Sequence, residues 1–229
     1  MEKIAKVKSI SIWIFIVPLF AINACLILIT NFHSLFPNQE HIIHNTIPYI
    51  DGGASISRTA RVFPTYLIFK PAMFLTSFLL IKYWYFNKEI INFFEKNHKY
   101  IKYFVFFGVG SAILLILHSI FLGIKFDNDL YKLFRRVVML LFILFEVIGQ
   151  TFLVLTLYSI KEKIKDHIKP NILKLKIVLV SILVTVAIIS IPIVSMPGNK
   201  AIKHALEWDY FVAVISFYLL TFLMWKIRK

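Results

Sequence analysis

Long apolar runs alternate along this chain with short segments that carry most of its lysines. A membrane-spanning helix needs about 20 mainly apolar residues, and six runs meet this length. They cover residues 9–30, 63–86, 103–124, 137–160, 177–196 and 205–225. The second run is the weakest, because Lys70 and Lys82 leave only residues 71–81 uncharged between them. Their long aliphatic stems allow both ammonium groups to reach a membrane interface. The pattern predicts an all-α fold, with one transmembrane domain of six helices over residues 1–229.

The distribution of basic residues predicts how these spans are oriented. Cytoplasmic loops carry an excess of Lys and Arg. Of the 26 basic residues, 17 lie at the N-terminus, after the second and fourth spans and in the tail, which holds Arg228 and Lys229. The opposite side, which includes Lys125, holds nine. We therefore expect both termini in the cytoplasm and the loop of residues 31–62 outside. A short interfacial helix is expected at residues 90–94.

Composition excludes several classes of protein. Hydrophobic residues make up 59% of the chain and charged residues 17%, against roughly half and a quarter in soluble domains. A net charge of +14 would indicate nucleic acid in a soluble protein. Here the lysines lie between spans, where anionic lipid headgroups explain them. We expect membrane lipids and no nucleic acid as partners, in a multi-pass protein of a bacterial inner membrane or, as the alternative, a eukaryotic endomembrane.

Four polar residues fall inside the predicted spans, where polar groups are costly: Asn23, His118, Glu146 and Gln150. Glu146 is about ten residues into the fourth span, and Gln150 follows one turn later on the same face. Glu146 is either a proton or ligand site or, as we prefer, a protonated carboxyl in an interhelical hydrogen bond. We expect Asn23 and His118 to be hydrogen-bond partners between helices. The single cysteine, Cys25, excludes an intrachain disulfide and a cysteine-based metal site.

Charged residues also gather at the outer ends of the spans, in a set we call the outer rim. It comprises Arg58, Arg61, Arg135, Arg136, His204, Glu207 and Asp209. Arginines form two-pronged hydrogen bonds with phosphates and carboxylates, so the rim could grip a lipid headgroup or pair internally. We expect the first loop to fold over the span ends, with Arg58 or Arg61 paired to Glu207 or Asp209. His204 and Glu207 share a helix face, but two side chains are a weak metal signal, and we predict no metal site and no cofactor. Trp208 is expected in the interfacial aromatic belt.

Short motifs along nearly the whole chain resemble the Frag1/DRAM/Sfk1 family of six-span membrane proteins. In the first loop these are Pro48-Tyr49-Ile50-Asp51 and Ile56-Ser57. Phe63-Pro64 and Ile68-Phe69 open the second span, and Glu207-Trp208 marks the start of the last. Asp51 departs from the family's usual serine, unless Ser57 takes that part through an offset. The resemblance implies lipid handling, as in GPI-anchor lipid remodelling, phospholipid distribution between leaflets or lysosomal autophagy control. It implies no catalytic residue set.

These observations favour an integral membrane protein that binds or organises lipid, or maintains the membrane, without defined catalysis. One alternative is an intramembrane lipid-modifying enzyme, which needs His118, His204, Glu207 or Glu146 to converge at one site. Another is a small-solute or proton-coupled transporter that uses Glu146. A lateral, lipid-sized groove would favour lipid binding. Convergence of histidine and carboxylate side chains would favour the enzyme, and a water-filled path past Glu146 would favour the transporter. The sequence predicts neither catalytic residues nor an oligomeric state.

Overall fold

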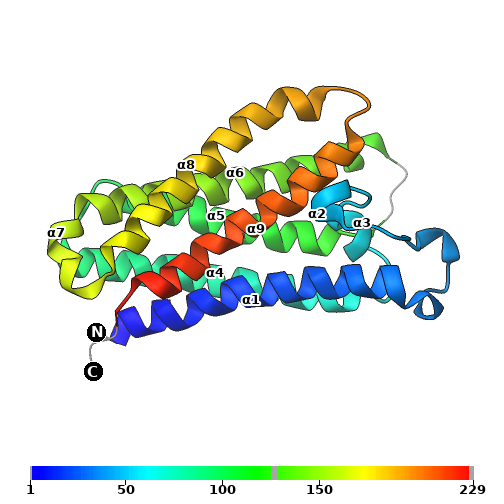
Figure 1. Ribbon diagram of the computed structural model, residues 1–229. Coiled ribbons are helices and arrows are strands. Elements are labelled where there is room, and N and C mark those ends of the chain that lie inside the picture. Colours follow the sequence, from blue (N-terminus) through cyan, green and yellow to red (C-terminus); the bar gives the residue numbers. More distant parts are fainter. Residues whose placement is uncertain (1, 125–127, 227–229) are drawn as a thin grey trace.

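The computed structural model describes residues 2–124 and 128–226, and within them the fold is all-α (Figure 1). Six of its helices are long and apolar enough to cross a membrane, which confirms the predicted fold class. They are α1 (Glu2–Asn31), α4 (Tyr66–Phe94), α5 (Ile101–Phe121), α6 (Asp129–Ser159), α8 (Pro170–Ser195) and α9 (Lys200–Met224). The doubtful second span is therefore a helix of spanning length. Lys125, Arg228 and Lys229, which entered the count of basic residues, lie outside the described residues.

Short elements connect the long helices. Between α1 and α4 lie η1 (His33–Leu35), η2 (Gln39–His41), α2 (Pro48–Asp51) and α3 (Ile56–Ala60). Between α6 and α8 lie α7 (Lys161–Ile164) and η3 (Lys165–His167). The first connection thus folds into helical turns that can pack against the spans.

Several predicted helix boundaries are wrong, because hydropathy detects the apolar centre of a helix and misses its polar ends. The helix α1 begins at Glu2 rather than residue 9, and α6 begins at Asp129, where the Asn128 side chain accepts a hydrogen bond from Leu130 N at 2.9 Å. Residues 90–94 form the last turns of α4 rather than a separate interfacial helix. Conversely, α4 starts later than residue 63, since a residue before proline, here Phe63, disfavours helical backbone.

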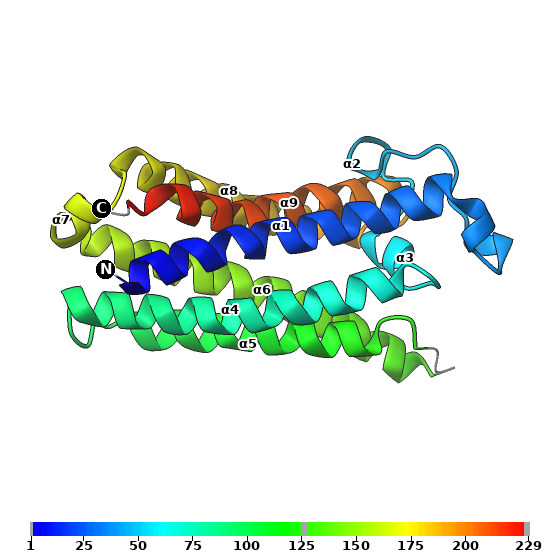
Figure 2. The same cartoon turned by 90° about the horizontal axis from the view of Figure 1, so that it is seen from below.

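The six long helices form a ring in chain order. Each packs against the next, from α1 through α4, α5, α6 and α8 to α9, and α9 packs back against α1. The start of α1 and the end of α9 lie together (Figures 1 and 2), where Lys8 Nζ donates to Trp225 O at 3.0 Å. We call this the terminal end. The opposite end, which holds α2 and α3, is the loop end.

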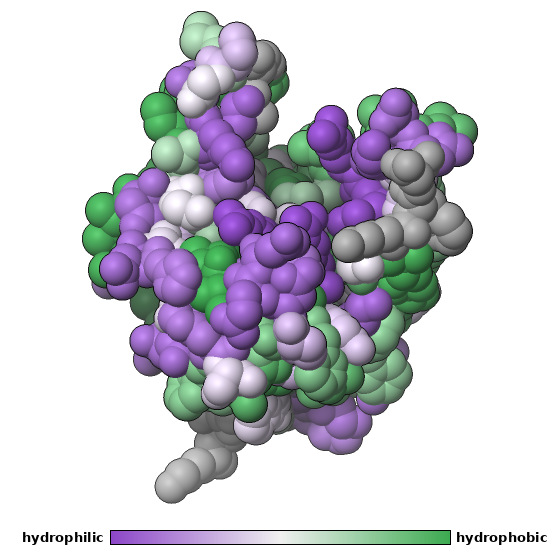
Figure 3. Space-filling view, turned by 90° about the vertical axis from the view of Figure 1, so that its right-hand side faces the viewer, coloured by the Kyte–Doolittle hydropathy of each residue, from purple (hydrophilic) through white to green (hydrophobic). Residues whose placement is uncertain are grey.

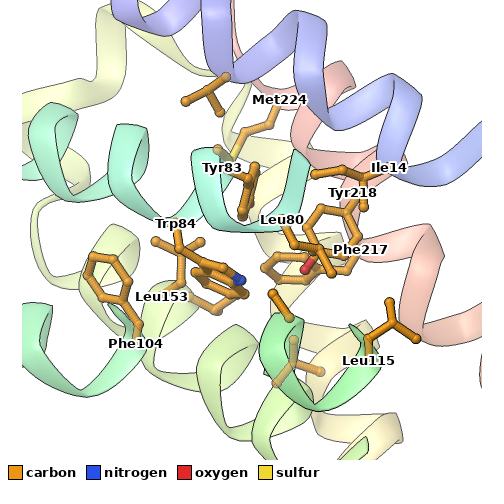
Figure 4. Packing of buried hydrophobic residues seen from close by; sticks show 14 of the residues in the cluster. Ile14, Leu80, Tyr83, Trp84, Phe104, Leu115, Leu153, Phe217, Tyr218 and Met224 are labelled. Atoms are coloured by element: carbon orange, nitrogen blue, oxygen red, sulfur yellow. The ribbon is translucent and has the colours of Figure 1, made fainter. Parts of the chain in front are cut away.

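Large aromatic side chains fill the bundle around its middle. Trp84 of α4 is fully buried next to Phe104 and Leu153 (Figure 4). The ring of Tyr83 lies edge-on to that of Tyr218 of α9, with 4.9 Å between the ring centres. A β-carbon on Gly108 would overlap the Trp84 ring. Glycine at this position therefore permits the close approach of α4 and α5.

The helix α8 behaves differently from the other five. Among its described side chains the last buried one is Leu183, and side chains farther along, such as Ile188 and Ile191, are exposed. Figure 1 shows this half of α8 diverging from the bundle toward the loop end. Consequently α8 covers α6 and α9 near the terminal end and leaves their loop-end halves less covered.

Candidate functional site: an apolar cavity inside the helix ring

The helix ring encloses a partly open cavity of about 140 Å³. Its walls come from α1, α4, α5, α6 and α9, and are almost entirely apolar. Ile56 and Ser57 of α3 close its top at the loop end, and Glu146 and Tyr218 lie at its floor near the middle of the bundle. His118 and Glu207 line its upper part. The cavity is thus an apolar compartment with a few polar groups at its two ends.

The first loop folds over the top of this cavity, as the sequence predicted. The His204 Nδ1 atom lies 2.8 Å from Gly52 O, and Trp208 Nε1 donates to Ala54 O at 2.8 Å. Gly52 adopts a positive φ of 60° against Ala201, where a β-carbon would overlap the helix backbone. Glycine is therefore required for this close approach. The sequence pattern, by itself, could not show which loop residue meets α9.

Trp208 and Asn23 both contact this loop, and neither occupies the position that the sequence predicted for it. Trp208 is fully buried beneath it, so its placement in the interfacial aromatic belt is wrong. Burial became possible because Ala54 O accepts the indole N–H. Asn23 of α1 accepts a hydrogen bond from Tyr49 OH at 3.0 Å, so it joins a helix to the loop and not to another span. Burial raises the pKa of Tyr49, and the nearby Asp209 carboxylate adds to this effect.

Glu207 lies against the backbone of α3 and is not paired with an arginine of the described part of the chain. Its carboxyl group interacts with the N–H groups of Ile56 and Ser57 in the first turn of that helix. These amides have no partner within their own helix and attract negative charge. Among the described residues, neither Arg58 nor Arg61 forms an ion pair with Glu207 or with the exposed Asp209. The backbone amides thus take the place of the expected arginine partner.

Three of the four rim arginines lie near one another at the loop end. Burial, together with the charges of Arg135 and Arg58, lowers the pKa of Arg61. Arg135 Nε is buried and lacks a hydrogen-bond partner within the described part of the chain. Arg135 lies one turn before Met139, which lines the cavity, so both share a face of α6. Arg136 is exposed. Figure 3 views the loop end and shows hydrophobic atoms deep between polar projections.

At the floor, Glu146 binds groups from three helices. Its Oε2 lies 2.6 Å from Ser111 Oγ of α5, and its Oε1 accepts from Gln150 Nε2 at 3.0 Å and from Tyr218 OH of α9. Ser111 Oγ also donates to Gly108 O at 2.7 Å, and a hydroxyl has only one proton to donate. A neutral carboxylic acid that donates to Ser111 satisfies every one of these contacts. The interhelical hydrogen bond predicted for Glu146 is confirmed.

Lys176 is a buried polar residue that the sequence analysis missed. It is fully buried, its Nζ donates to Thr221 Oγ1 at 2.7 Å, and it lies 3.8 Å from the centre of the Phe217 ring. Lys176 directly precedes the apolar run of residues 177–196, so the sequence pattern predicts it in the connecting loop. Helical spacing could have revealed it, since Leu173 and Val180 share its buried face.

The cavity brings together only part of the candidate catalytic set. His118, Glu146 and Glu207 line it, whereas His204 is held by the loop. Within residues 2–124 and 128–226, no group of three or more His, Cys, Asp or Glu side chains could hold a metal ion. The six apolar spans make the chain an integral, multi-pass membrane protein. No family model, no curated protein and no solved structure matches it.

Proposed function

We propose that this protein binds lipid by taking a hydrocarbon chain into the cavity of its helix ring. The observation that carries this proposal is the apolar lining of a compartment of about 140 Å³ inside a membrane bundle. An engineered apolar cavity of about 150 Å³ in another protein stays dry and binds benzene. A cavity of this size accommodates a segment of an acyl or isoprenoid chain, with the rest of the lipid outside.

The arginines at the loop end are suited to the headgroup of such a lipid. Arg58, Arg61 and Arg135 bring like charges together without a carboxylate partner among the described residues. Like charges in proximity repel, and an anion between them relieves this repulsion. A phosphate group accepts two-pronged hydrogen bonds from arginine. We therefore propose an anionic phospholipid, with its phosphate at these arginines and a chain directed into the cavity.

The chain is proposed to enter between the loop-end halves of α6 and α9. Met139 and Ile143 of α6 and Tyr210 and Val214 of α9 line the cavity on this side, and α8 diverges there (Figure 1). A chain that passes between α6 and α9 reaches the cavity directly from the lipid bilayer. The resemblance to the Frag1/DRAM/Sfk1 family, with its lipid-handling members, points in the same direction and forms part of this proposal.

A lipid-modifying intramembrane enzyme is the second candidate. It draws on the fact that His118, Glu146 and Glu207 line one cavity. Against it, Glu146 is already engaged by protein hydrogen-bond partners, and Glu207 lies against the backbone N–H groups of α3. General acid–base chemistry needs a group within hydrogen-bond reach of the reacting atom. Lipid binding without chemistry uses the same cavity and requires no such rearrangement.

Native mass spectrometry with matched variants of α6 tests this proposal. Ile143 lines the cavity, and its neighbour Leu144 is 52% exposed on the outer face. The purified protein is incubated with phosphatidylglycerol or phosphatidylcholine. We expect phosphatidylglycerol to be retained by the parent, the lipid bound in this cavity to be weakened at least tenfold by Ile143→Trp, so that each protein carries one lipid fewer, and little change with Leu144→Trp. Equal retention by all three proteins, with thermal melting unchanged, would overturn the cavity as the binding site. A lipid of altered mass would favour the enzyme instead.

A further inference from the structure

A second amphiphilic site lies at the opposite end of the bundle from the arginines. The end of α4 and the start of α5 form an open groove of about 840 Å³ at the terminal end. Lys88, Lys99 and Lys102 contribute its charged side chains, while Tyr103 and Phe106 extend it along α5. The groove shares no lining residue with the interior cavity, so it is independent of the function proposed above.

Among the described residues, no ion pair involves the lysines of this groove, and the two carboxylates nearest to them in sequence, Glu89 and Glu95, have other partners. Glu89 pairs with Lys3 at 3.2 Å. Glu95 pairs with Lys163 at 2.7 Å, and this hydrogen bond lowers the pKa of the Glu95 carboxyl group. No acidic side chain lines the groove within the described residues. Its polar half therefore attracts an anion.

The part of the groove that runs along α5 toward the middle of the bundle is suited to a hydrocarbon chain. Lys102 Nζ lies 4.9 Å from the centre of the Tyr103 ring, and Lys99 Nζ lies 4.7 Å from that of Tyr100. Farther along α5, Phe106 is 65% exposed, although it belongs to a membrane-spanning helix. Residues 102 and 106 are four apart and residues 103 and 106 are three apart within α5, so all three lie on neighbouring positions of one helix face, directly after the turn that holds Lys99. Cations and exposed rings thus line one continuous strip from the helix end toward the bilayer interior.

We propose that this groove is a specific site for one anionic phospholipid. The phosphate binds Lys88, Lys99 and Lys102, and an acyl chain lies against Tyr103 and Phe106. Charge complementarity selects the anionic headgroup, since basic pockets between spanning helices bind anionic lipids. The apolar continuation selects a lipid over a free phosphate ion. Two lipid sites at opposite ends of the bundle would then face opposite leaflets of the membrane.

Native mass spectrometry in the Ile143→Trp background isolates this groove from the interior cavity. The full-length protein is titrated with phosphatidylglycerol, with phosphatidylcholine and with inorganic phosphate as a competitor. We expect the K99Q/K102Q pair to weaken phosphatidylglycerol binding at least tenfold. The matched pair K165Q/K174Q removes two exposed lysines at the same end and is expected to stay within twofold of the parent.

Three outcomes would overturn the proposal. Equal weakening by both lysine pairs would show that diffuse surface charge attracts the lipid. Binding of phosphatidylcholine as tight as that of phosphatidylglycerol would remove the role of the lysines. Displacement of the lipid by inorganic phosphate at similar concentrations would make the groove a phosphate site. Thermal melting of each variant separates these results from misfolding. Because the Ile143→Trp background already blocks the cavity, failure here leaves the proposed function at the loop end untouched.

Discussion

Two oppositely ionisable residues are buried in this bundle without pairing to each other. Glu146 binds Ser111, Gln150 and Tyr218, whereas Lys176 binds Thr221 and faces the Phe217 ring. A buried charge is costly unless it is paired and hydrogen-bonded. Glu146 needs no counter-ion as a neutral acid bonded to hydroxyl and amide groups. For Lys176, the Thr221 hydroxyl group and the Phe217 ring face take the place of a counter-ion. The consequences can be tested one side chain at a time.

Replacing Glu146 with Gln is expected to be tolerated. The amide N–H₂ can donate to Ser111 Oγ, and the amide oxygen can accept from Gln150 and Tyr218, at nearly the same volume. Glu146→Leu loses these bonds and is expected to cost about 1 kcal/mol of stability. Thermal or denaturant unfolding in detergent measures both variants. If Gln destabilises as much as Leu, the neutral-acid hydrogen-bond pattern is wrong.

Lys176 is expected to be replaceable by methionine but not by alanine. Methionine keeps an unbranched chain against the Phe217 ring and removes a buried amine, so Lys176→Met should change stability by less than about 1.5 kcal/mol. Lys176→Ala leaves a cavity and should cost about 2–4 kcal/mol. The exposed Lys174→Ala serves as a control, with a change within about 0.5 kcal/mol. A loss with methionine as large as that with alanine would show that the amine itself, and not the packing of its chain, stabilises the bundle.

At the scale of elements, the loop with α2 and α3 acts as a cover over the cavity. It is held by contacts with α1 and α9, through Asn23, His204 and Trp208. The N-terminal amides of α3 in turn lie against the Glu207 carboxyl group. The loop and the last span are thus mutually dependent, although about 150 residues separate them in the chain.

Gly52 is the position where this docking should be most sensitive. Gly52→Ala adds a β-carbon against the Ala201 backbone and places it at positive φ. Gly198 has a positive φ of 90° with open space around it, so Gly198→Ala measures the backbone strain alone, about 1–2 kcal/mol. We expect a larger loss of stability and faster proteolysis of the loop with Gly52→Ala. Equal effects of the two variants would mean that the loop docks loosely.

Acid pH should release the turn at α2. Asp51 accepts hydrogen bonds from Thr46 Oγ1, Gly53 N and Ile47 N. These bonds, of which that from Thr46 has the largest effect, lower the pKa of the Asp51 carboxyl group below its ordinary value of 3.8. A lowered pKa stabilises the turn above that ordinary value, and the stabilisation is lost as the pH falls through the folded-state pKa. Pepsin cleavage of the loop should therefore increase below pH of about 3.8.

The variant Asp51→Asn provides the control for this pH dependence. An amide does not titrate, so its cleavage rate should change less over the same pH range than that of the parent, after correction for the activity of pepsin itself. A variant with the same acid-induced increase would place the titrating group elsewhere. The experiment reads loop accessibility and does not depend on lipid binding.

At the scale of the whole molecule, the ring order of the helices creates the cavity. Every long helix contacts its neighbours in sequence, and α9 closes the ring against α1. A ring of six helices leaves a space at its centre that the side chains fill only in part, as the cavity at Glu146 and above it demonstrates. The divergence of α8 then decides on which side this space approaches the lipid (Figure 1).

The orientation of this ring in the membrane is open to a direct test. The excess of lysines at the terminal end predicts that this end is cytoplasmic. Reporters fused at both termini and at Asn97, in the turn after α4, should all be active on the cytoplasmic side. A reporter at Gln39, in the first loop, should be active outside. Activity at Asn97 on the outside would contradict α4 as a spanning helix.

Much of the fold could be predicted from the sequence, and less of the site. The six spans follow from local hydropathy, and Glu146 with Gln150 follows from helical spacing. The arginine pairing with Glu207 was not predicted correctly, because backbone amides offer an alternative that side-chain types do not reveal. Lys176 was placed in a loop because one charged residue ended an apolar run, although the helix continues beyond it.

The sequence by itself determined that this chain forms six membrane helices with a strong bias of basic residues to one side. These properties depend on the order of residues over one helix length, since the bilayer requires each span to be apolar and internally hydrogen-bonded. The tertiary structure alone decided that Lys176 is buried, that Glu207 meets α3 and that a cavity extends upward from Glu146. Those features depend on which helix faces lie opposite each other, and such contacts join residues that are far apart in the chain.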